Sequence, residues 1–382
     1  MAGSDVRITE VEVIILDNGI EYGSRLPDGE MAGPRHTCLV RVGTDAGLDG
    51  YADVDSHPWV VRSIVEAASH IPEFCTGLRE AVLGQSIWDR TALWQRMYEF
   101  SWYHGRRGPV LHAMSGIDLA VWDLCGRLTD QPVHELLGGR RRDRITAYAS
   151  TLFRPTPAEM RQAARSYLNR GFRAIKFGWG PYGQDPALDH RLLAAAREEV
   201  GPDVRLMVDG HLEGDLDTIA RNLDGLAELD PYWVEEPLRA DRPADLARLG
   251  RSTSVRIASG EQLSGQTEFD ELLADDGVGV IQPDLSRCGG FTAFQSIATA
   301  ALAKGRMVVP HAWTSPLLTA ATLQAAAWLP DPVMLEFNVS SAPVSRDLAP
   351  SLAMVDGQIV VPDTPGLGVT IDLDVVDKYR VS

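Results

Sequence analysis

Residues 205–311 contain five short apolar runs, and each ends in an ionisable residue: RLMVD (205–209), WVE (233–235), ASGE (258–261), IQPD (281–284) and VVPH (308–311). The terminal residues are 26, 26, 23 and 27 positions apart. A short apolar run followed by a helical stretch is typical of a βα unit, and parallel strands of such units end on one common edge. The spacing therefore predicts that these five side chains meet in space.

The same pattern extends on both sides of this region. Eight such runs occur from residue 145 onward, at 145–150, 174–178, 205–209, 233–236, 255–261, 279–284, 306–311 and 333–337. Eight βα units close naturally into a barrel. We therefore expect an α/β fold, a (β/α)7β modified TIM barrel, over residues 136–340.

The first third of the chain has a different pattern, typical of mixed α+β structure. Residues 6–16 alternate in the manner of a strand, residues 38–42 predict a second strand, and residues 109–128 repeat apolar side chains at helical spacing. We predict an N-terminal α+β capping domain over residues 1–135. Residues 341–382 are expected to return to this domain.

Composition limits the possible partners. The 382 residues include 53 acidic and 36 basic side chains, a net charge of −17, and 45% of them are hydrophobic. An acidic surface repels phosphate, which argues against nucleic-acid binding. The four cysteines are scattered, the first 17 residues lack an apolar leader, and the run at 317–328 is too short to span a bilayer. We expect a cytoplasmic protein with no membrane partner.

The first three terminal residues are carboxylates on consecutive units. Asp209, Glu235 and Glu261 would repel one another at a shared barrel rim unless a cation held them. Ligands that are all oxygen favour a hard ion, so we predict an Mg²⁺ site. Solvated strand ends are the alternative, and the regular spacing of the three argues against it.

The next two terminal residues, Asp284 and His311, are expected to be neighbours on the same rim. A carboxylate bonded to one imidazole nitrogen prepares the other nitrogen to accept a proton, so this pair is a candidate catalytic base. A structural histidine bonded to an aspartate is the alternative.

Three further residues are site candidates. Lys176 ends the second predicted strand and could neutralise a substrate carboxylate, unless it is a surface lysine. His211 follows Asp209 by two positions and could point toward the substrate. Glu336, near the end of the eighth strand, could donate a hydrogen bond if protonated or simply pack there.

These motifs resemble those of the enolase superfamily, mandelate racemase subgroup, across nearly the whole chain. The similar segments are SGIDLAVWDLCGR (115–127), GFRAIKFG (171–178), VDGH (208–211), WVEEP (233–237), SGE (259–261), IQPDLSRCGG (281–290) and VVPHAW (308–313). The resemblance implies one or more metal ions held by Asp209, Glu235 and Glu261, a His311–Asp284 base, and Lys176 beside the substrate carboxylate. It also implies that loops 22–35 and 53–59 close over the site.

One departure narrows the expected activity. The subgroup often carries Lys-x-Lys on the second strand, whereas this chain has Lys176-Phe177-Gly178, so racemisation between two opposed bases loses one partner. His211 resembles a histidine of acid-sugar dehydratases. We therefore predict an Mg²⁺-dependent dehydratase, a hydro-lyase, that removes the proton α to a carboxylate and eliminates the β-hydroxyl to give a 2-keto-3-deoxy acid, with His211 or another group as the acid.

The rival hypotheses are an isomerase on the same scaffold (an epimerase or a sugar-lactone cycloisomerase), a non-catalytic binding barrel and a metal-dependent hydrolase. The expected substrate is an aldonic or aldaric acid, and family members commonly form homo-oligomers. The candidate pocket residues are Arg25, His57, Trp102, Tyr103, Trp179, Tyr182 and Trp313.

Overall fold

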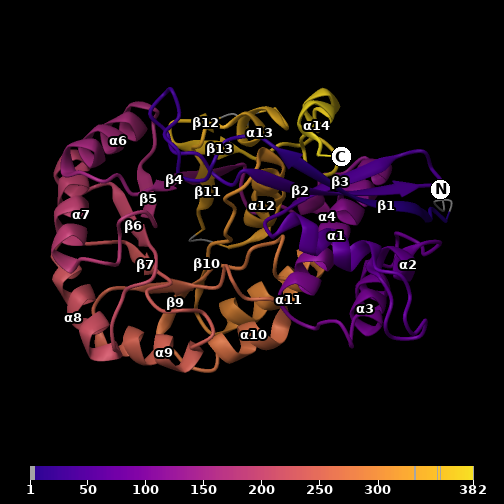
Figure 1. Ribbon diagram of the computed structural model, residues 1–382, viewed down its shortest axis with the longest axis horizontal. Coiled ribbons are helices and arrows are strands. Elements are labelled where there is room, and N and C mark those ends of the chain that lie inside the picture. Colours follow the sequence, from indigo (N-terminus) through magenta and orange to yellow (C-terminus); the bar gives the residue numbers. More distant parts are fainter. Residues whose placement is uncertain (1–4, 331–332, 351, 353, 382) are drawn as a thin grey trace.

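The computed structural model describes residues 5–330, 333–350, 352 and 354–381. Figure 1 shows an N-terminal α+β domain beside a ring of strands and helices, with the C-terminal segment lying between them. Within the described residues, no helix is both long enough and apolar enough to cross a membrane.

The N-terminal domain is an antiparallel sheet covered by helices. The sheet has the order β1 (Ile8–Asp17), β2 (His36–Thr44) and β3 (Asp49–Val54). The helices are α1 (Pro58–Glu66), α2 (Leu78–Val82), α3 (Arg90–Phe100), α4 (Pro109–Thr129) and α5 (Val133–Leu136). Strand β3 was not predicted from the sequence, because it contains Asp49 and Gly50, two residue types that are depleted in strands.

Helix α4 packs closely against this sheet because glycine allows it. A Cβ on Gly50 of β3 would lie 2.3 Å from the Ala120 carbonyl oxygen of α4. A Cβ on Gly116 of α4 would lie 2.6 Å from side-chain carbons of Val40 and Val54. The helix–sheet contact therefore depends on a missing side chain on each surface.

The predicted (β/α)7β barrel is confirmed. Its parallel strands are β4 (Arg144–Leu152), β5 (Ala174–Gly178), β6 (Arg205–Asp209), β7 (Trp233–Glu235), β8 (Ile257–Ser259), β9 (Val278–Ile281), β10 (Met307–Val308) and β11 (Leu335–Asn338). Strands β4 to β10 are neighbours in chain order, and β11 pairs with β4. The intervening helices are α6 (Pro157–Asn169), α7 (Pro186–Val200), α8 (Leu216–Ala227), α9 (Pro243–Ser252), α10 (Gly265–Leu272), α11 (Gly290–Ala303) and α12 (Pro316–Trp328).

Three barrel strands are shorter than predicted. The predicted strands extend to Glu261, Asp284 and His311, but β8, β9 and β10 end two or three residues earlier. Pro283 and Pro310 have no N–H to continue a ladder, which explains the ends of β9 and β10. The three functional candidates consequently lie on short loops above the strands.

The C-terminal segment touches both parts of the molecule. It contains α13 (Pro343–Asp347), β12 (Met354–Val355), β13 (Gln358–Val360) and α14 (Leu373–Tyr379). Strand β13 pairs antiparallel with the first half of β4. Beyond α14, the Val381 N–H donates to the Ile15 carbonyl of β1 at 2.8 Å.

The two domains are joined where α4 meets the start of α11. The Asp118 carboxylate accepts hydrogen bonds from the Thr292 hydroxyl at 2.6 Å and its backbone N–H at 3.1 Å. The Trp122 indole donates to the same hydroxyl at 3.0 Å. These buried contacts fix the N-terminal domain above the barrel rim.

Candidate active site

The site rests on a layer of side chains inside the barrel. Each barrel strand or its flank contributes one buried residue to this layer: Tyr148, Ala174, Met207, Trp233, Ala258, Val280, Val309 and Met334. Residues two apart on a strand face the same side. The next inward positions on five strands are Ser150, Lys176, Asp209, Glu235 and Glu336. Strand periodicity therefore places a polar layer directly above an apolar one.

The three predicted metal ligands lie together. Asp209, Glu235 and Glu261 are buried, and each offers a carboxylate oxygen within 4.8 Å of those of the other two. Asp209 Oδ1 is buried and has no hydrogen-bond partner among the described residues. Burial raises the pKa of Asp209 well above its usual value, and the neighbouring carboxylates raise it further. A cluster of this kind is stable as carboxylates only beside positive charge.

Lys176 supplies one such charge. Its Nζ lies 2.8 Å from Glu235 Oε1, 2.9 Å from Glu336 Oε1 and 3.3 Å from Asp209 Oδ2. Burial opposes the charged ammonium, but attraction to these carboxylates outweighs it and raises the pKa of Lys176. Lys176 is therefore a cation at the centre of the acidic cluster and not a surface lysine.

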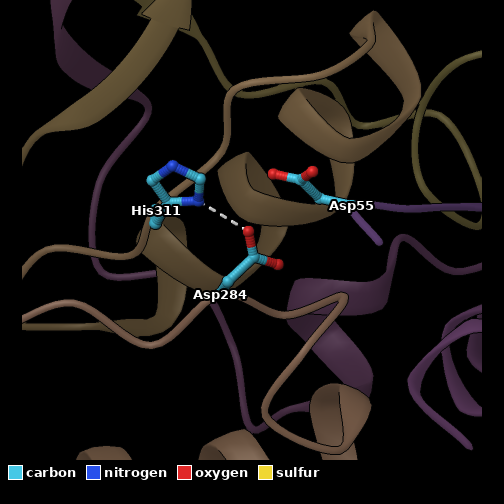
Figure 2. Close-up of side chains that lie close together, drawn as sticks. All are labelled: Asp55, Asp284 and His311. Carbon is cyan, nitrogen blue, oxygen red and sulfur yellow. Dashed lines mark hydrogen bonds and ion pairs between the residues drawn. The ribbon is translucent and has the colours of Figure 1, made fainter. Parts of the chain in front are cut away.

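The expected histidine–aspartate pair is formed. His311 Nδ1 lies 2.6 Å from Asp284 Oδ2, and Figure 2 shows the two side chains facing each other. The other Asp284 oxygen accepts from the Ser286 hydroxyl and backbone N–H, both at 2.6 Å. Asp284 is thus fully hydrogen-bonded and sets which His311 nitrogen faces the cavity. That nitrogen, Nε2, lies 2.9 Å from Glu261 Oε2.

Glu336 is held as a carboxylate. It accepts from the Ser150 hydroxyl at 2.7 Å and from the Ala312 N–H at 3.0 Å, in addition to its contact with Lys176. Burial alone would raise its pKa, but the charges of Lys176 and His311 outweigh burial and lower it to about 2. One of the two roles proposed for Glu336 from the sequence was that of a protonated hydrogen-bond donor. That role does not fit these contacts.

His211 is a site candidate that does not line the cavity described below. Its ring packs edge-to-face against Trp179 at 5.2 Å, and its Nε2 lies 4.0 Å from Glu236 Oε2. Trp179 lines the cavity, whereas His211 does not. The two-residue spacing correctly placed His211 near Asp209, but the loop after β6 directs it toward Glu236.

The polar layer opens into a cavity of about 210 Å³. It is lined by Tyr22, Pro34, Asp55, Ser150, Thr151, Leu152, Lys176, Gly178, Trp179, Asp209, Glu261, Arg287, His311, Trp313 and Glu336. Of the aromatic residues proposed from the sequence, Trp179 and Trp313 are present. Both predicted closing loops also contribute, through Tyr22 and Pro34 from the first and Asp55 from the second.

Five proposed pocket residues do not line this cavity, which corrects the sequence-based expectation. Trp102 and Tyr103 line a different cavity, beside the start of α10. Arg25 forms an ion pair with Glu159 of α6 at 2.6 Å. Tyr182 is buried and stacks on a phenylalanine, and His57 packs against a neighbouring tryptophan. Arg25, Tyr182 and His57 thus make local contacts that sequence position alone does not reveal.

The first closing loop is fastened to the barrel by a buried carboxylate. Glu30 accepts from the Tyr167 hydroxyl at 2.6 Å and pairs with Arg170 at 2.9 Å and with Arg154 at 3.2 Å. These three partners lie on α6 or close to one of its ends. The loop is therefore anchored beyond Tyr22, which contacts the Trp313 ring edge-on at 6.0 Å.

Sequence reasoning missed an ion pair between the domains. Arg287, three residues after Asp284, lies 2.6 Å from Asp55 Oδ2 and donates from Nε to the Asp55 carbonyl at 2.8 Å. Burial disfavours the guanidinium, but Asp55, Asp284 and Glu261 raise the pKa of Arg287. The motif IQPDLSRCGG offered a signal for Arg287, whereas nothing local marked Asp55 as its partner.

Comparison with known proteins agrees with this architecture. Two protein-family models match the sequence. That of the mandelate racemase / muconate lactonizing enzyme N-terminal domain matches residues 31–138, and that of the enolase C-terminal domain-like family matches residues 159–375. The D-galactarolactone cycloisomerase of Agrobacterium fabrum is 35% identical over 314 residues, covering 78% of this chain and 82% of that protein. The D-galactonate dehydratase of Xanthomonas oryzae is 30% identical over 366 residues, covering 91% of each.

A solved structure gives the same result. The 3,6-anhydro-D-galactonate cycloisomerase of Zobellia galactanivorans superposes with a TM-score of 0.87 at 28% identity, covering 98% of this chain and 100% of that one. The domain matches, the sequence relatives and the common fold together show that this chain belongs to the mandelate racemase / muconate lactonizing enzyme family of the enolase superfamily.

Proposed function

We propose that the protein is an Mg²⁺-dependent sugar acid dehydratase. It would remove the proton α to a carboxylate and eliminate the β-hydroxyl, giving a 2-keto-3-deoxy acid. The observation that carries this proposal is the His311–Asp284 pair beside a cluster of three carboxylates, with His311, Asp209 and Glu261 lining one cavity. Relatives named D-galactonate dehydratase and arabinonate dehydratase support the same reaction class.

The donor set fits the ion. Asp209, Glu235 and Glu261 offer only oxygen ligands, and the buried Asp209 Oδ1 has no hydrogen-bond partner among the described residues. These three residues would hold Mg²⁺, which when bound supplies positive charge to the substrate carboxylate as negative charge develops there.

The chain's own residues account for the proton transfers. Asp284 holds the Nδ1 side of His311, so Nε2 is the atom that takes the α-proton. Lys176, a buried cation on the cavity wall, stabilises the enediolate that forms. Because His311 lines the cavity and His211 does not, we assign the return of the proton to the leaving hydroxyl to His311 as well.

Racemisation between opposed bases is disfavoured by the wall of β5. A second lysine would have to replace Gly178, which lines the cavity. A Cβ there would lie 3.0 Å from Asp209 Oδ2. A side chain there would thus require the Asp209 carboxylate of the proposed metal site to shift by a few tenths of an ångström.

A cycloisomerase is the second candidate, and the position of His211 favours it. If the leaving oxygen is the ring oxygen of a lactone, it leaves as a carboxylate and stays in the product, so no acid is needed to protonate it. Two relatives named D-galactarolactone cycloisomerase and 3,6-anhydro-alpha-L-galactonate cycloisomerase support this alternative. Its first step uses the same His311.

A substrate panel separates these possibilities. Aldonic acids, aldaric acids and their lactones are incubated with the protein and Mg²⁺, and products are analysed for a 2-keto group and for mass. A keto product that has lost the mass of one water supports the dehydratase, and a keto product with the mass of its substrate supports the cycloisomerase. Deuterium uptake from solvent without a keto product would instead indicate an epimerase. The His311→Asn variant serves as the control.

A further inference from the structure

The charges that line the cavity are unevenly distributed. Asp55, Asp209, Glu261 and Glu336 contribute carboxylates, and these face only two permanent cations, Lys176 and Arg287. An anionic substrate entering such a cavity meets favourable charge only where a cation is free to pair with it.

Neither permanent cation is free. Lys176 lies within 3.3 Å of three carboxylates on the barrel floor. Arg287 pairs with Asp55 at 2.6 Å, donates to the Asp55 carbonyl at 2.8 Å, and donates from Nη1 to the Glu261 carbonyl at 3.2 Å. Each of the three guanidinium nitrogens therefore already has a protein partner.

Asp55 is itself fixed in place. Its backbone N–H donates to the Ser286 hydroxyl at 2.9 Å, so three hydrogen bonds or ion pairs tie it to the loop after β9. Figure 2 shows its carboxylate beside the His311–Asp284 pair. A carboxylate held on the cavity wall in this way is a hydrogen-bond acceptor for hydroxyl groups and repels a second anion.

The rest of the wall is neutral. Among the described lining residues outside the acidic floor, Tyr22, Thr151, Trp179 and Trp313 offer hydroxyl and indole groups. Arg25, an arginine of the first closing loop, is held outside the cavity by Glu159. The far end of a bound acid thus finds neutral hydrogen-bonding groups and one carboxylate, but no unpaired cation.

We infer that this site takes acids with a single carboxylate, and that Asp55 determines this by neutralising Arg287 and presenting its own charge. The inference rests on the proposed function, because it assumes that one substrate carboxylate goes to the proposed metal site. The far end of the substrate then carries neutral hydroxyls or a lactone. Aldaric acids, which have two free carboxylates, are excluded by charge and not by size. The second carboxylate would be repelled by Asp55, and this repulsion provides the specificity.

The test compares binding of matched acids that differ only at the far end. D-gluconate with D-glucarate, and D-galactonate with D-galactarate, are titrated calorimetrically into the Mg²⁺-loaded protein in the His311→Asn background, where no proton is removed. We expect each monocarboxylate to bind at least about tenfold more tightly than its dicarboxylate, since like charges placed together weaken binding strongly. The Asp55→Asn variant, which frees Arg287 from its charged partner, is expected to reverse or erase this ratio.

Glu159→Gln is the matched control, because it frees Arg25 outside the cavity and should leave the ratio unchanged. If the protein that retains Asp55 binds the dicarboxylates more tightly than the monocarboxylates, the inference is overturned. It is also overturned if Asp55→Asn leaves the ratio of the two affinities unchanged. Binding of monocarboxylates with no turnover by the His311 enzyme contradicts the proposed function alone. Binding of neither acid contradicts both. The ratio of monocarboxylate to dicarboxylate affinity is first measured in protein that retains Asp55. This comparison tests the inference even if the Asp55→Asn variant folds poorly.

Discussion

His311 is positioned by contacts from two different segments. Asp284 and Ser286 of the loop after β9 hold its Nδ1 side, and Glu261 of the loop after β8 lies against Nε2. His211, in contrast, contacts Trp179 and Glu236. At the scale of single residues, the two histidines therefore have different environments, although both follow strand ends.

This difference predicts unequal effects of the same substitution. His311→Asn should lower turnover by about 10²–10⁴-fold, the usual contribution of a general base, whereas His211→Asn should cost less than about tenfold. The measurement is the steady-state rate on whichever acid the panel identifies. Exchange of the α-proton with solvent deuterium is measured alongside, since only His311→Asn should abolish it.

Equal losses in the two variants would contradict the assignment and restore His211 as the acid. Circular dichroism and Mg²⁺ titration of both variants show whether either loss reflects unfolding.

At the scale of elements, the contact of α4 with the start of α11 joins the domains. Asp118 is buried there beside Gly290, which has a φ of 75°. A Cβ on Gly290 would lie 2.2 Å from Asp118 Oδ2. The glycine is thus required both by backbone conformation and by the close approach of the other domain.

Two glycine substitutions separate these requirements. Gly84 has a φ of 74°, and a Cβ there meets no atom within 4 Å. Gly84→Ala should therefore cost only the left-handed backbone penalty of about 1–2 kcal/mol. Gly290→Ala should lose about 1–3 kcal/mol more through the collision with Asp118. Urea unfolding of both variants measures the two losses of unfolding free energy. Equal losses would show that α4 shifts at little cost to accommodate the added methyl group.

The same interface predicts a pH effect on stability. Burial raises the pKa of Asp118 to about 7, against hydrogen bonds from Thr292 and the charge of Arg90 that lower it. The unfolded value is about 3.9. Since the folded pKa is the higher one, this group's contribution to stability is complete below about pH 4 and is lost as the pH rises to about 7.

Asp118→Asn should remove that dependence. Between about pH 5 and about pH 8, the unfolding free energy of the unmodified protein should fall by roughly 3 kcal/mol relative to the variant. Urea titrations of both proteins at the two pH values give this difference directly. A constant difference at both values would mean that Asp118 does not change protonation in the folded state.

At the scale of the whole molecule, the net charge of −17 is partly concentrated at one barrel rim. Binding of a divalent cation only to the folded cluster would stabilise the chain by mass action, by about 2.7 kcal/mol at one hundred times the dissociation constant. We therefore expect Mg²⁺ to raise the melting temperature and a chelator to reverse the rise. Asp209→Asn should abolish the shift, while Asp275→Asn, which changes an exposed carboxylate, should leave it intact; a shift that survives in Asp209→Asn would indicate another site.

The sequence by itself determined the barrel and the grouping of Asp209, Glu235, Glu261, Asp284 and His311. The physical reason is periodicity: each βα unit repeats at near-constant length, so residues at successive strand ends must share a rim. Strand alternation likewise places Lys176 two positions above Ala174 and therefore inside the barrel.

Only the tertiary structure decided what surrounds that rim. Asp55 and Arg287 are 232 positions apart and lie in different domains, and no periodic pattern relates them. The turn of the loop after β6 directs His211 away from the cavity, and local ion pairs and ring contacts hold Arg25 and Tyr182 elsewhere. Strand ends follow from local patterns, whereas loop directions and contacts between domains depend on packing across the whole chain, so the composition of the cavity wall required the folded structure.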